Sequence, residues 1–212
     1  MTPRILLALI ALALAPSPAL AHPHVWVTSR ADILYGADGR VTGVRHSWTF
    51  DRAYSAFVTQ GLDTDKDGKL SPAELEPLAK ENTDSLVDFE YFTVLKANGT
   101  KQAFEAPRDA GMTYVNEEAT LTFVLPLKAP AAANRSLLLE VSDPSYFVAF
   151  TMAEGDAVKL AGAPKGCAAT ITRPKPMDVS QQQNLSESFF QALSASSNFG
   201  AQFANRALVA CP

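Results

Sequence analysis

The chain has 212 residues, with 18 basic and 22 acidic side chains and a net charge of −4 at pH 7. Its basic residues are not clustered, which argues against nucleic acid as a partner and disfavours binding to an anionic membrane surface. The length suits one domain, or one domain with an insertion.

The first 21 residues have the pattern of a secretory signal peptide. Arg4 supplies the positive charge, residues 5–15 form the apolar run, and Ala19-Leu20-Ala21 is a cleavage motif. The apolar run has about half of the roughly 20 residues that a membrane-spanning helix needs. We therefore expect cleavage before His22, a mature chain with no stable membrane insertion, and, once Arg4 is removed, 17 basic against 22 acidic residues.

Cys167 and Cys211 are the two cysteines of the chain, and both lie in the exported part. In an oxidising compartment an isolated pair of cysteines more often forms a disulfide than a metal site or a nucleophile. We expect a Cys167–Cys211 bridge that ties the end of the chain to the segment after Lys165.

Short segments rich in β-branched and aromatic residues alternate with turn signals over residues 24–152. The expected strands are 24–35, 41–50, 92–97, 100–104, 112–115, 119–127, 136–141 and 146–152. Asn98-Gly99, Asn116-Glu117 and Asp143-Pro144 mark three of the turns. This spacing predicts a mainly β protein with some helix, built as an antiparallel β-sandwich.

Two regions carry helical rather than strand periodicity. One is an insertion over about 52–81 within the sandwich of residues 22–154, and the other is the tail, 177–212, where Leu185, Phe189, Phe190 and Leu193 have helical spacing. Residues 155–176 are rich in Gly, Ala and Pro and are interpreted as a linker. We expect an EF-hand-like helical insertion, and C-terminal helices that the disulfide ties back.

The stretch 63–74, DTDKDGKLSPAE, lies inside the insertion. An EF-hand calcium loop needs oxygen ligands at positions 1, 3, 5, 7, 9 and 12 and a glycine at position 6, which Gly68 supplies. Counted from position 1, the expected ligands are Asp63, Asp65, Asp67, the carbonyl of Lys69, Ser71 through water, and Glu74.

An acidic turn before a helix is the alternative, because Ser71-Pro72-Ala73-Glu74 is also a helix capping box. The capping box does not explain why four carboxylates are crowded into twelve residues, so we favour calcium. No second loop is visible in the sequence. A lone loop is expected to bind calcium weakly, with a Kd of about 10⁻⁴ to 10⁻³ M, and to stabilise rather than signal.

Signal cleavage would leave His22 with a free α-amine and place His24 two residues further on. In an extended strand both imidazoles point to one face, so the pair could chelate zinc, nickel, cobalt or copper. If the first hairpin turns near Ala37-Asp38, His46 falls opposite Arg30, several residues away from His24. We expect His46 to be a half-buried strand residue, and a ligand only if the fold brings it to the other two.

Catalytic signatures are lacking. The sequence has no G-x-S-x-G elbow and no glycine-rich phosphate loop, and Glu117-Glu118 falls at an expected turn. The aromatic residues Tyr91, Phe92, Tyr146, Phe147 and Phe150 are assigned to the core. We expect a protein that is not an enzyme.

Several motifs together resemble a known family. They are the opening His22-Pro23-His24-Val25-Trp26, Thr49-Phe50-Asp51, the acidic loop, Tyr91-Phe92, Asp143-Pro144-Ser145-Tyr146-Phe147, and Phe203-Ala204 before Cys211. The chain resembles the domain-of-unknown-function 1007 (DUF1007) family, described as periplasmic components of an uncharacterised transport system. The resemblance implies a periplasmic location, a neighbouring nickel/cobalt permease of the NicO/RcnA type, and a role in transition-metal uptake, with His22 and His24 matching the family's opening histidines.

We therefore expect a periplasmic metal-binding accessory protein that holds calcium and captures a transition metal for an inner-membrane permease. A calcium-stabilised β-sandwich interaction module, whose histidines are incidental, is the alternative. An oxidative copper enzyme with a histidine brace is disfavoured, because the chain has three histidines and either His24 or His46 would have to face His22.

Overall fold

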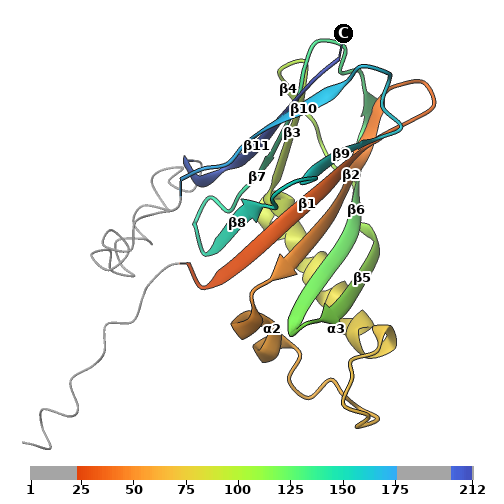
Figure 1. Cartoon of the computed structure of the whole chain (residues 1–212). Helices are drawn as coiled ribbons and strands as arrows, with labels where there is room; N and C mark the ends of the chain where they lie inside the picture. Colours follow the sequence, from red (N-terminus) through yellow and green to blue (C-terminus); the bar gives the residue numbers. More distant parts are fainter. Residues whose placement is uncertain (1–22, 176–201, 212) are drawn as a thin grey trace, which may run out of the picture.

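The computed structural model describes residues 23–175 and 202–211. These residues form two β-sheets with two α-helices and one 3₁₀-helical segment, Leu86–Phe92, beside them (Figure 1). The expected sandwich-like, mainly β architecture is confirmed. Within the described ranges, no helix is long and apolar enough to cross a membrane.

The first sheet has the order β5-β6-β2-β1-β8, and β9 also pairs with β1. Its strands are β1 (Val25–Tyr35), β2 (Val41–Phe50), β5 (Arg108–Val115), β6 (Glu118–Ala131), β8 (Val148–Met152) and β9 (Val158–Ala161). Both β8 and β9 run parallel to β1, so the expectation of a purely antiparallel sandwich is wrong at this edge. A parallel partner must be supplied by a distant part of the chain, which local turn signals do not reveal.

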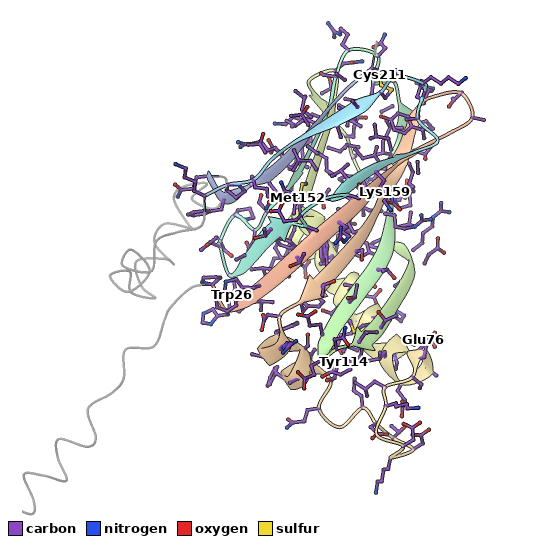
Figure 2. All side chains as sticks on the ribbon, viewed as in Figure 1. Trp26, Glu76, Tyr114, Met152, Lys159 and Cys211 are labelled. Carbon is purple, nitrogen blue, oxygen red and sulfur yellow. A yellow bond between two sulfur atoms is a disulfide. The ribbon has the colours of Figure 1, made fainter. Side chains whose placement is uncertain are left out.

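The second sheet has the order β10-β11-β7-β3-β4. Its strands are β3 (Thr93–Ala97), β4 (Thr100–Lys101), β7 (Leu137–Val141), β10 (Ala168–Thr172) and β11 (Asn205–Ala210). The expected disulfide is confirmed: Cys167, just before β10, is bonded to Cys211, just after β11. Figure 2 shows Cys211 at the opposite end of the molecule from Glu76.

Strand content extends beyond the residues for which the sequence predicts it. Residues 155–176, expected to be a linker, contain β9 and β10, and the end of the expected helical tail is β11. Residues 205–210 alternate between buried and exposed, which is the period of a strand and not of a helix. Most of the tail, residues 176–201, lies outside the described residues, as does the expected signal peptide.

The core lies between the sheets and beneath the helices, and a buried asparagine joins the two sheets. Asn205 of β11 is fully buried, donates from Nδ2 to the carbonyl of Phe150 at 2.7 Å, and accepts from the backbone N–H of Met152 at 2.9 Å. Both partners lie on β8 of the other sheet. Because both the nitrogen and the oxygen of the Asn205 side chain have a hydrogen-bond partner, this residue fixes β11 against β8 without leaving either atom unpaired.

A β-bulge changes the register of the first hairpin. Near the turn, Tyr35 pairs with Val41, but a bulge between Leu34 and Tyr35 shifts the following pairs by one residue. His46 therefore lies opposite Ala31 rather than opposite Arg30 as expected. Beside this turn, a Cβ added at Gly43 would lie 2.7 Å from the carbonyl oxygen of Leu125, so only glycine allows β2 to approach β6 here.

Candidate metal centre

The helix before the acidic loop is fixed to the first sheet through its cap and one buried serine. Helix α2 (Arg52–Val58) begins after Asp51, whose carboxylate accepts from the N–H of Tyr54 and from the N–H of Trp26, both at 3.0 Å. The buried Ser55 donates to the carbonyl of Phe50 at 3.3 Å and accepts from the N–H of Ala119 at 2.9 Å. These contacts hold α2 at the end of β2 and beside β6.

The helix after the loop begins with the capping box that the sequence predicts. Helix α3 (Pro72–Ser85) has Ser71 as its N-cap. The Ser71 hydroxyl accepts from the N–H of Glu74 at 3.4 Å, and the Glu74 carboxylate accepts from the N–H of Ser71 at 2.9 Å. Its buried residues are Leu75, Ala79 and Thr83; Leu75 and Ala79 belong to the hydrophobic core, and the helix contacts β5 and β6. The loop between α2 and α3 is therefore held at both of its ends, and it projects away from the sheets (Figure 1).

Three of the expected ligands come together in this loop. One carboxylate oxygen from each of Asp63, Asp65 and Asp67 lies within 4.8 Å of the other two. The loop backbone turns around these carboxylates: the N–H of Asp67 donates to Asp63 and Asp65 at 3.1 Å, and the N–H of Gly68 donates to Asp63 at 3.1 Å. Gly68 has φ +80°, the left-handed conformation that glycine adopts most readily, as expected for position 6 of a calcium loop.

Glu74 does not belong to this cluster. Its Oε1 accepts from the N–H and hydroxyl of Thr64 at 2.7 and 2.9 Å, and its Oε2 accepts from the N–H and hydroxyl of Ser71 at 2.9 and 2.8 Å. Hydrogen bonds lower the pKa of Glu74 to about 2. The largest contribution comes from the N–H of Ser71, and the Ser71 hydroxyl and the N–H and hydroxyl of Thr64 add to it. The carboxylate is therefore ionised at neutral pH and bridges the two sides of the loop.

The donor set suits a hard cation. Three converging carboxylates repel one another, and neither Lys66 nor Lys69 of the same loop forms an ion pair with them among the described residues. Oxygen ligands in a flexible loop are the kind that calcium prefers. The residues present therefore fit calcium at positions 1, 3 and 5. Glu74 does not belong to this group of converging carboxylates.

The two described histidines, His24 and His46, lie far apart. His22 lies outside the described residues, and His24 is exposed at the start of β1, with its ring 4.7 Å from that of Phe147. His46 lies on β2 opposite Ala31, which is seven residues after His24 on the neighbouring strand β1, and it is fully buried. At about 3.3 Å per residue, this separation places His46 more than 20 Å from His24, so these two histidines do not share a site.

His46 is more deeply buried than the sequence predicts, and burial lowers its pKa to about 3. The Thr93 hydroxyl donates to the carbonyl of Tyr91 at 2.8 Å, so its oxygen accepts from Nε2–H of His46 at 3.2 Å. Nδ1 of His46 has no hydrogen-bond partner among the described residues. The imidazole is therefore neutral and packs between Trp48 and Phe123.

Sequence reasoning missed an aromatic cavity between the first sheet and α3. It assigned Phe92, Phe147 and Phe150 to the core, but these side chains also line the cavity together with Trp48, and Phe147 is 47% exposed. A partly exposed aromatic side chain beside a turn is a weak signal, because single exposed apolar residues are common. The cavity becomes visible only when strands distant in sequence are brought together.

Comparison with known proteins identifies relatives but gives no activity. A curated protein from Haemophilus influenzae, named only "Uncharacterized protein", is 24% identical over 195 residues, which cover 91% of this chain and 92% of the relative. The disulfide is of the kind found in proteins outside the reducing cytoplasm. The family model described as "Protein of unknown function (DUF1007)" matches residues 7–211, and the chain therefore belongs to the DUF1007 family.

Proposed function

We propose that this protein is an exported, non-catalytic metal-binding protein with one calcium site in the loop of residues 63–74. The convergence of the Asp63, Asp65 and Asp67 carboxylates within 4.8 Å is the observation that supports this proposal most strongly. Their positions, the left-handed Gly68 and the flanking helices α2 and α3 match the pattern of a calcium loop.

Calcium would neutralise the repulsion among these carboxylates. The proposed ligands are the side chains of Asp63, Asp65 and Asp67, the carbonyl of Lys69, Ser71 through water, and the carboxylate of Glu74. Glu74 is also the third residue of α3 and caps that helix through Ser71. The site would therefore link the loop to α3, whose buried face packs against the core, and a stabilising role follows from this connection.

Transition-metal capture at the N-terminus, in the periplasm and for an inner-membrane permease, is the finer part of the proposal. It depends on the His22-Pro23-His24 start, and His24 lies exposed where β1 begins. Zinc, nickel, cobalt and copper all accept imidazole ligands. The competing function is a calcium-stabilised interaction module, for which the exposed aromatic residues Trp26 and Phe147 near His24 would be part of the contact surface.

Elemental mass spectrometry separates these functions. The protein should be exported by its own leader, so that its true N-terminus forms, and purified without chelators. With calcium held well above the expected Kd, we expect about one calcium per chain, lost in Asp65→Asn but kept in Asp84→Asn, which changes an exposed aspartate of α3 outside the loop.

A bound transition metal that disappears in the His22→Ala, His24→Ala double variant supports metal delivery. Calcium alone favours the interaction module. Absence of calcium from the wild-type chain at millimolar calcium contradicts the proposed function.

A further inference from the structure

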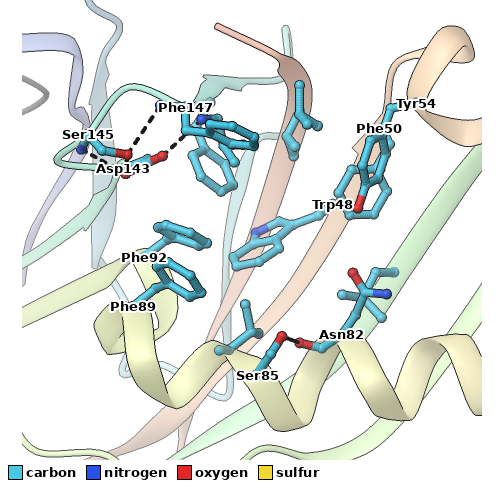
Figure 3. A pocket seen from close by; sticks show the side chains of 16 residues that line it. Trp48, Phe50, Tyr54, Asn82, Ser85, Phe89, Phe92, Asp143, Ser145 and Phe147 are labelled. Carbon is cyan, nitrogen blue, oxygen red and sulfur yellow. Dashed lines mark hydrogen bonds between the residues drawn. The ribbon is translucent and has the colours of Figure 1, made fainter. Parts of the chain in front are cut away.

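A cavity of about 430 Å³ lies between the first sheet and the segment that joins α3 to β3. One wall comes from β1 and β2, including Val27, Trp48 and Phe50, and the facing wall comes from Leu86, Phe89 and Phe92. Figure 3 shows the Trp48 indole projecting into the space between these walls. The volume is within the range of small-molecule pockets in proteins.

Both walls contain aromatic side chains, and several of these rings contact one another. The ring centroids of Phe89 and Phe92 are 5.1 Å apart with nearly parallel planes, and the Trp48 ring lies 5.1 Å from Phe150 and 6.3 Å from Phe92. Among the lining residues, Phe89 is 53% exposed and Phe147 is 47% exposed. Both rings are therefore accessible to solvent as well as to the cavity.

Trp48 carries an unpaired hydrogen-bond donor in this wall. Its side chain is 2% exposed, and its Nε1 has no hydrogen-bond acceptor among the described residues. A buried indole N–H normally finds a partner, because leaving it unpaired costs folding free energy. Nε1 is shielded from solvent in this structure, so an acceptor atom on a bound ligand would satisfy it once the indole shifts toward the cavity. An N–H contact with the face of Phe123 or Phe150 is the competing explanation, since both rings meet Trp48 edge to face.

The charge of the cavity limits the class of ligand. Asp143 is the only charged residue among the described residues that line it. The Asp143 carboxylate accepts from the N–H of Ser145 at 2.8 Å, from its hydroxyl at 2.7 Å and from the N–H of Val148 at 2.9 Å. A negative charge at one end and no basic side chain in the lining disfavour an anionic ligand.

The backbone beside the cavity is strained. Glu90, Tyr91 and Phe92 follow one another with φ of 48°, 58° and 48°, the left-handed region that residues with a Cβ seldom adopt in succession. Such conformations persist where surrounding structure enforces them, and they cluster at ligand sites. Here the turn places Phe92 against Trp48 and Phe150.

We propose that this cavity binds a neutral, mainly apolar small molecule whose carbonyl or ether oxygen accepts the hydrogen bond of Trp48 Nε1–H. The aromatic walls would supply most of the affinity, and the indole N–H would select ligands with an acceptor at one end. None of the residues of the acidic loop, 63–74, lines this cavity.

Three probes with one ring system test the proposal by nuclear magnetic resonance on ¹⁵N-labelled mature protein. They are 2-acetylnaphthalene, which carries the acceptor, 2-isopropenylnaphthalene, a hydrocarbon of the same shape, and 2-naphthoate, which is anionic. The chain has two tryptophans, so its spectrum has two indole N–H signals, and Trp26→Phe assigns the signal of Trp48.

We expect the ketone to move the Trp48 signal downfield in a saturable way and to bind about threefold to tenfold more tightly than the hydrocarbon, with naphthoate weakest. The hydrocarbon corrects for the ring current of the naphthalene. No saturable change at Trp48, or equal affinities for ketone and hydrocarbon, would overturn the proposal. Equal affinities would point to a cavity for an apolar side chain of a protein partner.

Two sets of variants check the location. Phe89→Ala should weaken ketone binding at least threefold, whereas Val87→Ala should leave it unchanged, because Val87 is similarly exposed on the same segment but does not line this cavity. Trp48→Phe should abolish the preference for ketone over hydrocarbon while keeping a ring in the wall. A preference that survives in Trp48→Phe, or equal effects of Phe89→Ala and Val87→Ala, contradicts the assignment.

Discussion

Replacing both Cys167 and Cys211 with alanine would remove the covalent link between the start of β10 and the end of β11. The bond closes a loop of 44 residues. In the chain-entropy model, opening a loop of this length raises the conformational entropy of the unfolded chain. This lowers the free energy of unfolding by at most about 4 kcal/mol at 25 °C. A domain of ordinary stability has about 5–15 kcal/mol in total, so the variant should lose a large part of its free energy of unfolding.

Urea unfolding followed by circular dichroism measures this loss. Three samples are compared: the oxidised wild type, the wild type with its disulfide reduced, and the double alanine variant. Agreement between the two bond-free samples shows that the lost bond, and not the lost packing of two half-buried sulfurs, causes the change. The dependence on urea should also steepen, because the unlinked chain exposes more surface when it unfolds. A loss below about 1 kcal/mol in both bond-free samples would refute the entropic reasoning.

Three further predictions concern buried or capping groups. Burial keeps the pKa of His46 at about 3, so below pH 6.5 the unfolded chain takes up a proton on this residue and the folded chain does not. As the pH falls below 6.5, the free energy of unfolding measured in urea titrations should therefore fall by up to about 1.4 kcal/mol per pH unit. The same dependence of the free energy of unfolding on pH in His46→Leu would contradict this. Ser55→Ala leaves the N–H of Ala119 without its acceptor and should cost about 1–3 kcal/mol in urea unfolding. An effect no larger than that of Ser85→Ala, at the exposed end of α3, would count against it. Hydrogen bonds hold the pKa of Glu74 near 2, so its stabilisation should be complete above pH 4.5 and lost as the pH falls toward 2. Acid titration of helicity in a His46→Leu background, with and without Glu74→Gln, checks this, and identical curves would exclude a role for Glu74.

Features with a local signal were predictable from the sequence. The turn at Asn98-Gly99, the capping box at Ser71 and the pairing of the two cysteines each depend on a few neighbouring residues or on simple counting. The three aspartates of the acidic loop also come together as their spacing indicates. Except for the disulfide, which links residues 44 apart and follows from counting, the relevant geometry is set within about one turn of chain.

Features that depend on distant segments were not predictable. The parallel pairing of β8 and β9 with β1 and the strand at Asn205–Ala210 need partners far away in sequence. One bulge beside Tyr35 was enough to move His46 to a different partner, because register carries through the whole strand. The cavity around Trp48 requires walls from two strands and the segment after α3, and no single stretch of sequence encodes it.

Calorimetric titration of calcium into the chelator-treated mature protein shows whether the loop of residues 63–74 binds calcium. We expect one site per chain with a Kd of about 10⁻⁴ to 10⁻³ M. The heat should vanish in Asp65→Asn, which removes one of the three converging carboxylates, and remain in Asp84→Asn. No binding at calcium concentrations tenfold above this Kd, or binding that is unchanged in Asp65→Asn, would show that this loop is not the calcium site.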